Sequence, residues 1–239
     1  MAGRPCYTTG MFIGHFAVGL AAKRIAPRVS LGTLFAAAQL LDLVWPALVL
    51  LGLEKVRVDP GNTAFTPLDF VSYPWTHSLL MVLVWATGFA LIYLARTGFS
   101  RGAWVVGALV LSHWVLDFVT HRPDLPLAPG AAKVGLGLWN SVPATVIVEG
   151  TLFVVGVYLC ATGTRARNRT GRIAFRALVA FLVGIYVANM LGPPPPSARA
   201  IGVAGLAMWL FIPWAVWIDR NREPVHGPSR SAIATSPSS

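Results

Sequence analysis

Long apolar segments, separated by shorter polar connections, dominate the pattern of hydrophobic and polar positions along this chain. A helix needs about 20 consecutive apolar residues to cross a lipid bilayer. Seven segments approach that length, at about 8–26, 29–53, 76–95, 102–121, 141–162, 173–191 and 200–218. The pattern therefore predicts an all-α protein, a polytopic transmembrane helical bundle of about six to seven helices.

The first of these segments differs from the others. Its apolar stretch is short, and Gly14, His15 and Gly19 interrupt it. Basic residues follow it, rather than the small-residue cleavage site that ends a signal peptide. We expect a retained helix that enters the bilayer only in part or re-enters on the same side.

The composition agrees with a membrane protein. The chain has 239 residues, of which 55% are apolar and 12% are charged, whereas soluble proteins carry roughly 25% charged residues. These proportions exclude a soluble enzyme, a disordered protein and a coiled coil. We interpret residues 1–219 as a single integral-membrane helical domain, with the motifs described below in residues 11–150. Residues 220–239 are rich in Ser, Pro and Arg and are predicted to form a disordered tail.

The positive charges predict how the chain is oriented. The net charge is +10, which in a soluble protein would indicate a nucleic-acid partner. Here the basic residues gather in loops, so we expect no nucleic acid. Alternate loops carry 13 Lys and Arg, and the loops of the opposite side carry 6. The positive-inside rule then places the C-terminus in the cytoplasm and the long loops 54–75 and 122–140 outside.

Ionisable residues inside or at the ends of the apolar segments are the most informative feature of the sequence. One charge at the centre of a spanning helix costs about 2.5–3.5 kcal/mol. A helical rise of 1.5 Å per residue places seven such groups in the outer half of the bilayer. They come from five segments and are His15, Asp42, His77, His113, Asp117, His121 and Glu149. One polar site that opens to the outside explains this shared depth.

The spacing of His113 and Asp117 indicates a metal site. Residues four apart lie on one face of a helix, so this pair can bind one ion. Nitrogen and carboxylate ligands without cysteine fit a divalent metal, zinc first, with manganese or iron as alternatives. The surplus of candidates indicates two metals, which suit phosphoester hydrolysis, or further groups that orient the imidazoles. His121 lies about 12 Å along the helix from His113, and its role stays open.

Each candidate also has a purely structural interpretation, as a helix-packing histidine, a helix-cap partner or a hydrogen-bonded pair. Asp42 and Gln39, for example, lie three residues apart on one helix face. Glu149 has no basic residue in its own segment, so it needs a partner from another helix.

Four short stretches carry a resemblance to a known family. They are GHFAVGL (14–20), LLDLVWP (40–46), YPWTHSLL (73–80) and SHWVLDFVTH (112–121), within a match that runs from about residue 11 to 121. These stretches resemble the predicted membrane-bound metal-dependent hydrolases that are often described as YdjM-like. The resemblance implies a multi-pass protein of the bacterial inner (plasma) membrane with a hydrolase-like metal site. By position, the resemblance implies that the metal ligands are His15, Asp42, His77, His113 and Asp117.

The chain departs from that family's pattern at two places. Members commonly carry two aspartates separated by one residue in the second segment, where this chain has Asp42 alone. His-Arg-Gly often precedes the Thr-His-Ser element, where this chain has Tyr73, Pro74 and Trp75. Both departures argue against a complete two-metal centre.

Two functional hypotheses follow. The first is an integral-membrane metal-dependent hydrolase, surrounded by membrane lipids, that acts on an ester or phosphoester of a lipid or lipid-linked substrate at the outer leaflet. Its expected parts are the ligands His113, Asp117, Asp42 and His77, the general base Glu149, and His15 as a further ligand or as the acid for the leaving group. The alternative is a non-enzymatic membrane protein, either a metal or proton carrier or an assembly factor, with a structural polar cluster. Polar groups confined to one half of the bilayer favour the enzyme.

Overall fold

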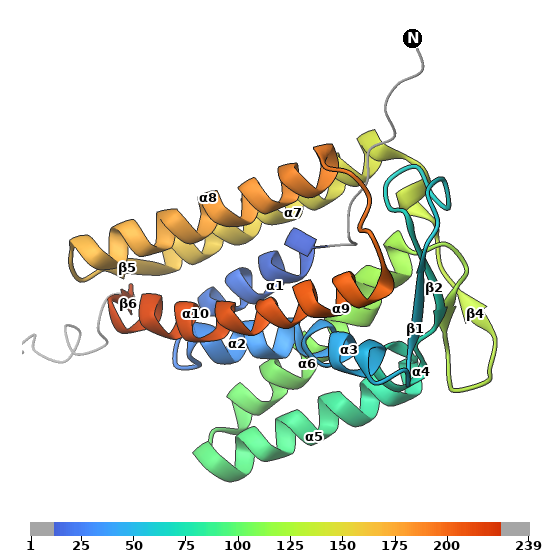
Figure 1. Ribbon diagram of the computed structural model, residues 1–239. Coiled ribbons are helices and arrows are strands. Elements are labelled where there is room, and N and C mark those ends of the chain that lie inside the picture. The colour runs from blue at the N-terminus through green and yellow to red at the C-terminus, as the bar shows by residue number, and fades with distance from the viewer. Residues whose placement is uncertain (1–11, 226–239) are drawn as a thin grey trace, which may run out of the picture.

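Long helices that run side by side make up most of the protein (Figure 1). The computed structural model describes residues 12–225. Within this range, five helices are long and apolar enough to cross a membrane, and a bent pair of shorter helices makes the number six if that pair is one broken span. The five are α5 (Leu79–Thr97), α6 (Ser100–Thr120), α7 (Val142–Gly163), α8 (Arg169–Leu191) and the continuous segment Ala198–Arg220. The expected all-α membrane bundle is confirmed.

The last span has three parts that follow one another without a break. They are α9 (Ala198–Leu206), the 3-10 turn η2 (Ala207–Leu210) and α10 (Phe211–Arg220). The connector that precedes α9, residues 192–197, carries four prolines in a row. Such a run favours an extended backbone, so the connector separates the end of α8 from the start of α9.

The bent pair consists of α2 (Leu31–Ala38) and α3 (Leu40–Leu50), which meet at an angle of 54°. The helix breaks at Gln39, whose backbone leaves the helical conformation. Asp42 lies in the first turn of α3, where the helix dipole favours a negative charge. Ala38 ends α2, so its carbonyl is among those that a helix end leaves free for another partner.

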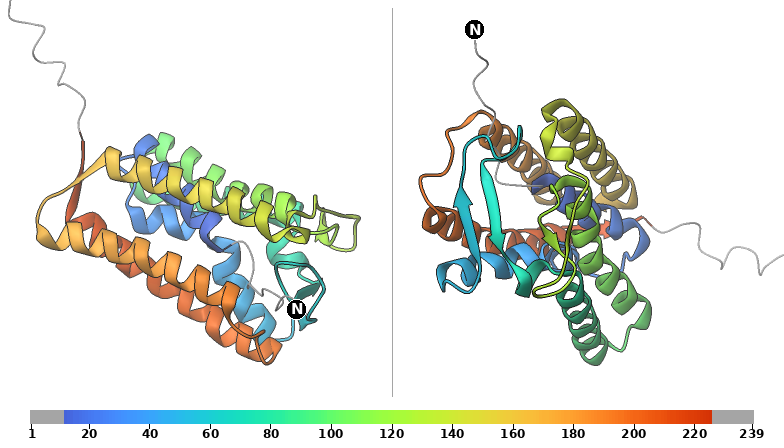
Figure 2. Two further views of the ribbon diagram at one scale, coloured as in Figure 1. Left: turned by 90° about the horizontal axis from the view of Figure 1, so that it is seen from above. Right: turned by 90° about the vertical axis from the view of Figure 1, so that its right-hand side faces the viewer.

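Helix α1 (Phe12–Ile25) is shorter than each of the five helical segments that are long enough to cross a membrane. Its 14 residues rise about 21 Å, against about 30 Å for the hydrocarbon core of a bilayer. It lies inside the bundle and packs along α7 (Figures 1 and 2). The backbones approach closely at Gly156, where any side chain would overlap the carbonyl oxygen of Ala17. The expectation that the first segment enters the bilayer only in part stays a prediction, and residues 8–11 of that segment lie outside the described residues.

Short hairpins and turns cover the end of the bundle at which α5 begins. They are β1 (Lys55–Val58) with β2 (Leu68–Ser72), β3 (Leu125–Pro126) with β4 (Lys133–Val134), the single turn α4 (Pro74–His77) and η1 (Leu138–Asn140). Figure 2 shows them gathered at this end, which we call the hairpin end.

The opposite end carries one antiparallel pair, β5 (Thr164–Ala166) with β6 (Arg222–Pro224). Strand β6 therefore lies within the segment 220–239 that the sequence predicts to be disordered. Residues 226–239 of that segment lie outside the described residues.

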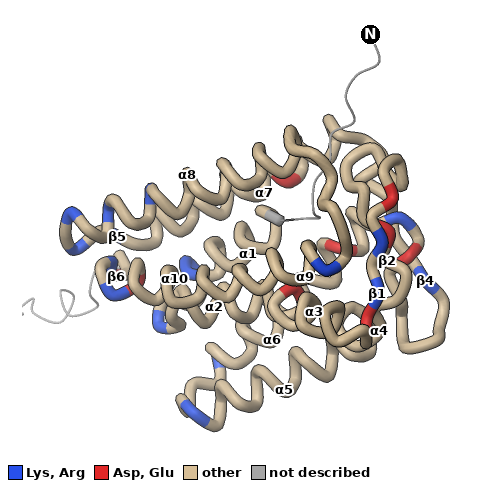
Figure 3. Tube along the Cα trace, in the orientation of Figure 1, with Lys and Arg blue, Asp and Glu red and all other residues tan. Residues whose placement is uncertain are grey.

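Lys and Arg residues gather toward the β5–β6 end, as the blue positions along the Cα trace in Figure 3 show. Of the lysines and arginines in residues 12–225, five belong to the hairpin end and its loops: Lys55, Arg57, Arg122, Lys133 and Arg199. The other twelve lie on the loops and helix ends toward β5 and β6: Lys23, Arg24, Arg28, Arg96, Arg101, Arg165, Arg167, Arg169, Arg172, Arg176, Arg220 and Arg222. The two groups of loops distinguished in the sequence therefore lie at opposite ends of one bundle.

Candidate metal centre

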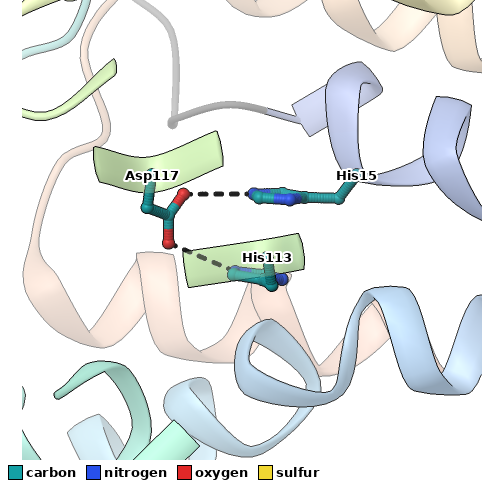
Figure 4. Close-up of side chains that lie close together, drawn as sticks. All are labelled: His15, His113 and Asp117. Carbon is teal, nitrogen blue, oxygen red and sulfur yellow. Dashed lines mark ion pairs between the residues drawn. The ribbon is translucent and has the colours of Figure 1, made fainter. Parts of the chain in front are cut away.

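Five ionisable side chains that are far apart in the sequence meet inside the bundle, toward the hairpin end. They are His15 on α1, Asp42 on α3, His77 on α4, and His113 and Asp117 on α6. Two groups of three have their ligand atoms within 4.8 Å of one another: His15 with His113 and Asp117, and Asp42 with His77 and His113. Figure 4 shows the first group. The structure thus brings together every residue that the sequence proposes as a ligand.

Four of these side chains form a compact set of donor atoms. The Nε2 atom of His77 lies 3.5 Å from Asp42 Oδ1 and 3.7 Å from Asp117 Oδ2. The Nε2 atom of His113 lies 3.7 Å and 3.4 Å from the same two oxygens. A tetrahedral ion with bonds of about 2.0–2.1 Å holds its ligand atoms roughly 3.3 Å apart. The four printed separations between histidine nitrogens and carboxylate oxygens are close to that spacing. The ligand atoms of Asp42, His77 and His113 all lie within 4.8 Å of one another, and Asp117 Oδ2 adjoins both rings.

A hydrogen bond fixes the orientation of the His113 ring, and so determines which ring nitrogen faces the carboxylates. Its Nδ1 atom lies 2.8 Å from the carbonyl oxygen of Ala38 at the break between α2 and α3. A carbonyl oxygen only accepts, so Nδ1 carries the proton and donates it. The neutral ring then presents the lone pair of Nε2, which is fully buried and has no hydrogen-bond partner among the described residues.

His77 reaches the same state through a relay of two residues. The hydroxyl of Thr76 donates to Glu54 Oε2 over 2.7 Å, which uses its only proton. The Nδ1 atom of His77, 2.6 Å from the same hydroxyl oxygen, must therefore be the donor in that contact. Glu54 also accepts from the backbone amides of Trp75 and Thr76. The Nε2 atom of His77 is left to face the carboxylates with its lone pair.

Glu54 and Thr76 were not singled out in the sequence. Glu54 stands in a polar loop among other charged residues, and nothing nearby in the chain distinguishes it. Thr76 offers one signal, its place directly before His77. Both residues are buried, and they orient a histidine in the way that carboxylates commonly orient metal ligands.

His15 occupies the far side of Asp117. Its Nε2 atom lies 3.2 Å from Asp117 Oδ1, whereas Asp117 Oδ2 faces His77 and His113. Its ring stacks on that of His113, with centroids 3.6 Å apart and planes 4° from parallel (Figure 4). His15 can therefore hold Asp117 in position through a hydrogen bond, or its Nε2 atom and Asp117 Oδ1 can together bind an ion.

Glu149, expected as a general base, lies elsewhere. It is fully buried on α7 and is not among the residues that line the cavity beside the cluster. Its carboxylate lies near the backbone amides of Ile13 and Gly14 in the first turn of α1, but neither oxygen has a hydrogen-bond partner among the described residues. The partner from another helix that the sequence interpretation required is therefore not found in residues 12–225.

A cavity of about 490 Å³ adjoins the cluster. The polar residues His15, Asp42, His77 and Asp117 line one end of it, and aromatic side chains of the hairpin end line its wall. From there it continues between α8 and the segment Ala198–Arg220. The candidate ligands are thus accessible from a largely apolar space.

His121, whose role the sequence left open, lines the same cavity. Helix α6 ends at Thr120, and the extended backbone of His121 turns its ring away from the helix. The Nδ1 atom lies 2.9 Å from Asp124 Oδ1, to which the hydroxyl of Tyr73 also donates over 3.1 Å. Because Nδ1 is bonded to Asp124, the second ring nitrogen, Nε2, is the one that can bond to groups in the cavity.

The partners of His121 keep fixed protonation states. Burial raises the pKa of Tyr73 well above its usual value, and the neighbouring Asp124 adds to the increase. Burial also acts to raise the pKa of Asp124, but hydrogen bonds from His121, Arg122 and Tyr73 outweigh it and lower the pKa overall. Near neutral pH, Asp124 is therefore a carboxylate and Tyr73 a neutral phenol, and both favour the Nδ1–H form of His121.

Comparisons with protein-family models, with curated proteins and with solved structures find no match to this chain. The resemblance to the YdjM-like hydrolases therefore rests on the four sequence stretches alone.

Removing the Thr76 hydroxyl tests the relay. Thr76→Val keeps the side-chain shape but leaves the Nδ1–H of His77 without its acceptor, so the ring is free to turn or change tautomer. We expect the affinity for Zn²⁺, measured by competition with a chelating dye in detergent, to fall by about 10–100-fold. Thr162→Val is the matched control, because Thr162 is exposed and bonds only within α7. Equal affinities in the two variants would show that the relay does not orient a ligand.

Proposed function

We propose that this protein is an integral-membrane metal-dependent hydrolase. One observation carries the proposal: two buried histidines, each with Nδ1 held by a fixed acceptor, direct Nε2 lone pairs at two carboxylates. In the neutral rings these lone pairs face negative charges at 3.4–3.7 Å. Such an arrangement needs a positive charge, either a proton on a ring or a cation between the groups. The site therefore fits a divalent ion held by His77, His113, Asp42 and Asp117.

Zinc is the metal that we propose, with manganese or iron as the other outcomes of a metal analysis. Two imidazole nitrogens and two carboxylate oxygens, without sulfur, suit all three ions. Zinc is proposed first because histidine and carboxylate ligands are those of catalytic zinc sites.

The proposed reaction is hydrolysis of an ester or phosphoester in a lipid or lipid-linked molecule. A bound divalent ion supplies Lewis acidity, which polarises the ester oxygen and acidifies a water molecule. The protein's own residues do the rest. Asp42 and Asp117 balance the charge of the ion, His15 holds the second oxygen of Asp117, and the apolar cavity excludes bulk water.

His121 is the side chain best placed to move a proton in this reaction. It lines the cavity beside the cluster, and Asp124 and Tyr73 hold its Nδ1 edge. Its Nε2 atom can then take a proton from water or give one to the leaving oxygen. We propose His121 for the role that the sequence analysis assigns to Glu149, because Glu149 does not line the cavity.

The carrier alternative has less support in the structure. A transport path needs polar groups through the whole depth of the bundle. Toward the β5–β6 end, the buried polar side chains of the described residues are Lys23 and Thr164. Lys23 is held by Asp219 and two backbone carbonyls, and Thr164 by the carbonyl of Cys160. These bonded groups lock helices together, and they form no continuous path.

For the orientation, we propose that the β5–β6 end and the C-terminus face the cytoplasm of a bacterium whose inner membrane holds the protein. Basic residues prefer the cytoplasmic side, and they gather at this end (Figure 3). The cluster and its cavity then open toward the outer leaflet.

Asp117→Asn tests the metal site with little change in size. The amide retains hydrogen bonding but loses the charge that a divalent ion needs in a low-dielectric site. We expect purified Asp117→Asn protein, analysed by mass spectrometry of bound elements, to lose most of its metal and its hydrolytic activity. His113→Ala should lose metal as well.

Asp59→Asn is the control for this experiment, because Asp59 is an exposed carboxylate in the loop between β1 and β2. A packing role for the cluster gives a different pattern, with a lower melting temperature and unchanged metal content at equal folded fraction. Full occupancy and full activity in Asp117→Asn protein would remove the case for a metal centre.

His121→Gln separates proton transfer from metal binding. The variant should keep its metal content, because His121 is not one of the proposed ligands. We expect kcat to fall by about 10²–10⁴-fold, the usual contribution of a general acid or base. Asp124→Asn should cause a smaller loss through the same ring. An unchanged kcat for His121→Gln, with metal content equal to that of the parent, would contradict this role.

A reporter fused after Ser239 tests the orientation. Green fluorescent protein folds in the cytoplasm, whereas alkaline phosphatase is active only outside. We expect fluorescence from the first fusion and no phosphatase activity from the second. The reverse result would place the cluster in the inner leaflet.

A further inference from the structure

The cavity beside the cluster is open on its side. After passing the cluster, it follows α8 on one side and the segment Ala198–Arg220 on the other. The lining residues Phe181 and Leu210 are 47% and 69% exposed on the outer surface. A cavity whose lining reaches such exposed residues opens between these two helices, where Figure 1 shows α8 and α9 diverging.

This side opening lies at the depth of the lipid tails. Phe181 is ten residues from the end of α8 at Leu191, and Leu210 is twelve residues from the start of the last span at Ala198. At 1.5 Å per residue, these distances are about 15 Å and 18 Å, close to the midplane of a hydrocarbon core about 30 Å thick. Acyl chains, and no water, are present at that depth.

The lining of this part of the cavity suits a flexible hydrocarbon chain. Small residues of the last span, Ala200, Ala204 and Ala207, leave room that larger side chains would fill. Ile185 and Met208 add apolar surface, and Asn189 on α8 is near the hairpin end. A volume of about 490 Å³ is within the range of about 300–1,000 Å³ that small-molecule sites have.

We infer that the cavity between α8 and Ala198–Arg220 binds one acyl chain of a membrane lipid, which enters sideways from the bilayer. The chain lies along Ala204 and Ile185, and the ester end of the lipid lies beside His77 and Asp117. That the ester is then cleaved rests on the proposed function, whereas binding of the chain does not. The substrate class is therefore a glycerolipid or another lipid with a long alkyl chain, rather than a water-soluble ester.

Photolabelling in proteoliposomes tests the acyl-chain site directly. The probe is a phosphatidylglycerol with a diazirine in the middle of one acyl chain, diluted in phosphatidylethanolamine. We expect mass spectrometry to find labelling enriched on peptides that contain Phe181 and Leu210. Ile147 and Val154 supply the reference, because both are exposed on α7 and neither lines the cavity.

Ala204→Trp is the variant that closes the cavity. Its indole fills space that the chain needs, and we expect labelling at Phe181 and Leu210 to fall by about tenfold, as for overpacking of a fitted site. Val203→Trp is the matched control, because Val203 is 58% exposed on the same helix and does not line the cavity. If the Ala204→Trp protein fails to fold, the comparison of labelling at Phe181 and Leu210 with labelling at Ile147 and Val154 in the parent protein still tests the site.

The outcomes separate this inference from the proposed function. Enriched labelling without hydrolysis of the lipid supports the acyl-chain site and contradicts the hydrolase. Hydrolysis of the probe with labelling no higher at Phe181 and Leu210 than at Ile147 and Val154 overturns the acyl-chain site and leaves the hydrolase standing. Equal labelling in Ala204→Trp and Val203→Trp proteins would also overturn it.

Discussion

The meeting of two carboxylates and two histidine rings at one place is the constraint on which the hairpin end of the bundle depends. Asp117 is buried and Asp42 is partly exposed, and each histidine uses Nδ1 for a fixed hydrogen bond and turns Nε2 toward these carboxylates. Such an arrangement is costly for the protein alone. It becomes favourable when a cation supplies the missing positive charge, so the fold and the proposed metal support each other.

The elements around the cluster are shaped to keep this arrangement. The break at Gln39 brings Asp42 to the first turn of a new helix and frees the carbonyl of Ala38 for His113. The single turn of α4 places His77 beside Thr76, which Glu54 holds from the preceding loop. The break at Gln39 and the single turn of α4 thus position Asp42, His77 and the hydrogen-bond acceptor of His113.

The sequence predicted the bundle and the members of the cluster, because a membrane restricts both strongly. A charge inside an apolar segment is costly, so Asp42, His113 and Asp117 stand out without knowledge of the fold. Glu54 and Asp124 did not stand out, because a carboxylate in a polar loop has no such cost until the fold buries it. Glu149 was predicted as a general base from its depth alone, and it does not line the cavity. Helical rise gives the depth of a residue but not the direction in which its side chain points.

The side opening of the cavity was also beyond the sequence. It depends on how far α8 diverges from the last span, and hydropathy is the same for a helix that touches its neighbour and for one that leaves a gap. The four prolines of the connector between α8 and α9 predict a stiff, extended segment. Only the packing shows how far apart this segment holds the two helices.

The short helix α1 has a consequence for how the protein is made. Helix α1, which carries His15, packs on α2, α6 and α7, and the close contact between Ala17 and Gly156 joins positions 139 residues apart. At about 5–20 residues per second, the ribosome needs on the order of ten seconds to make the intervening chain. During that time α1 lacks its contacts with α7. The final packing of α1, and with it the final position of His15, is therefore reached only after α7 has been made.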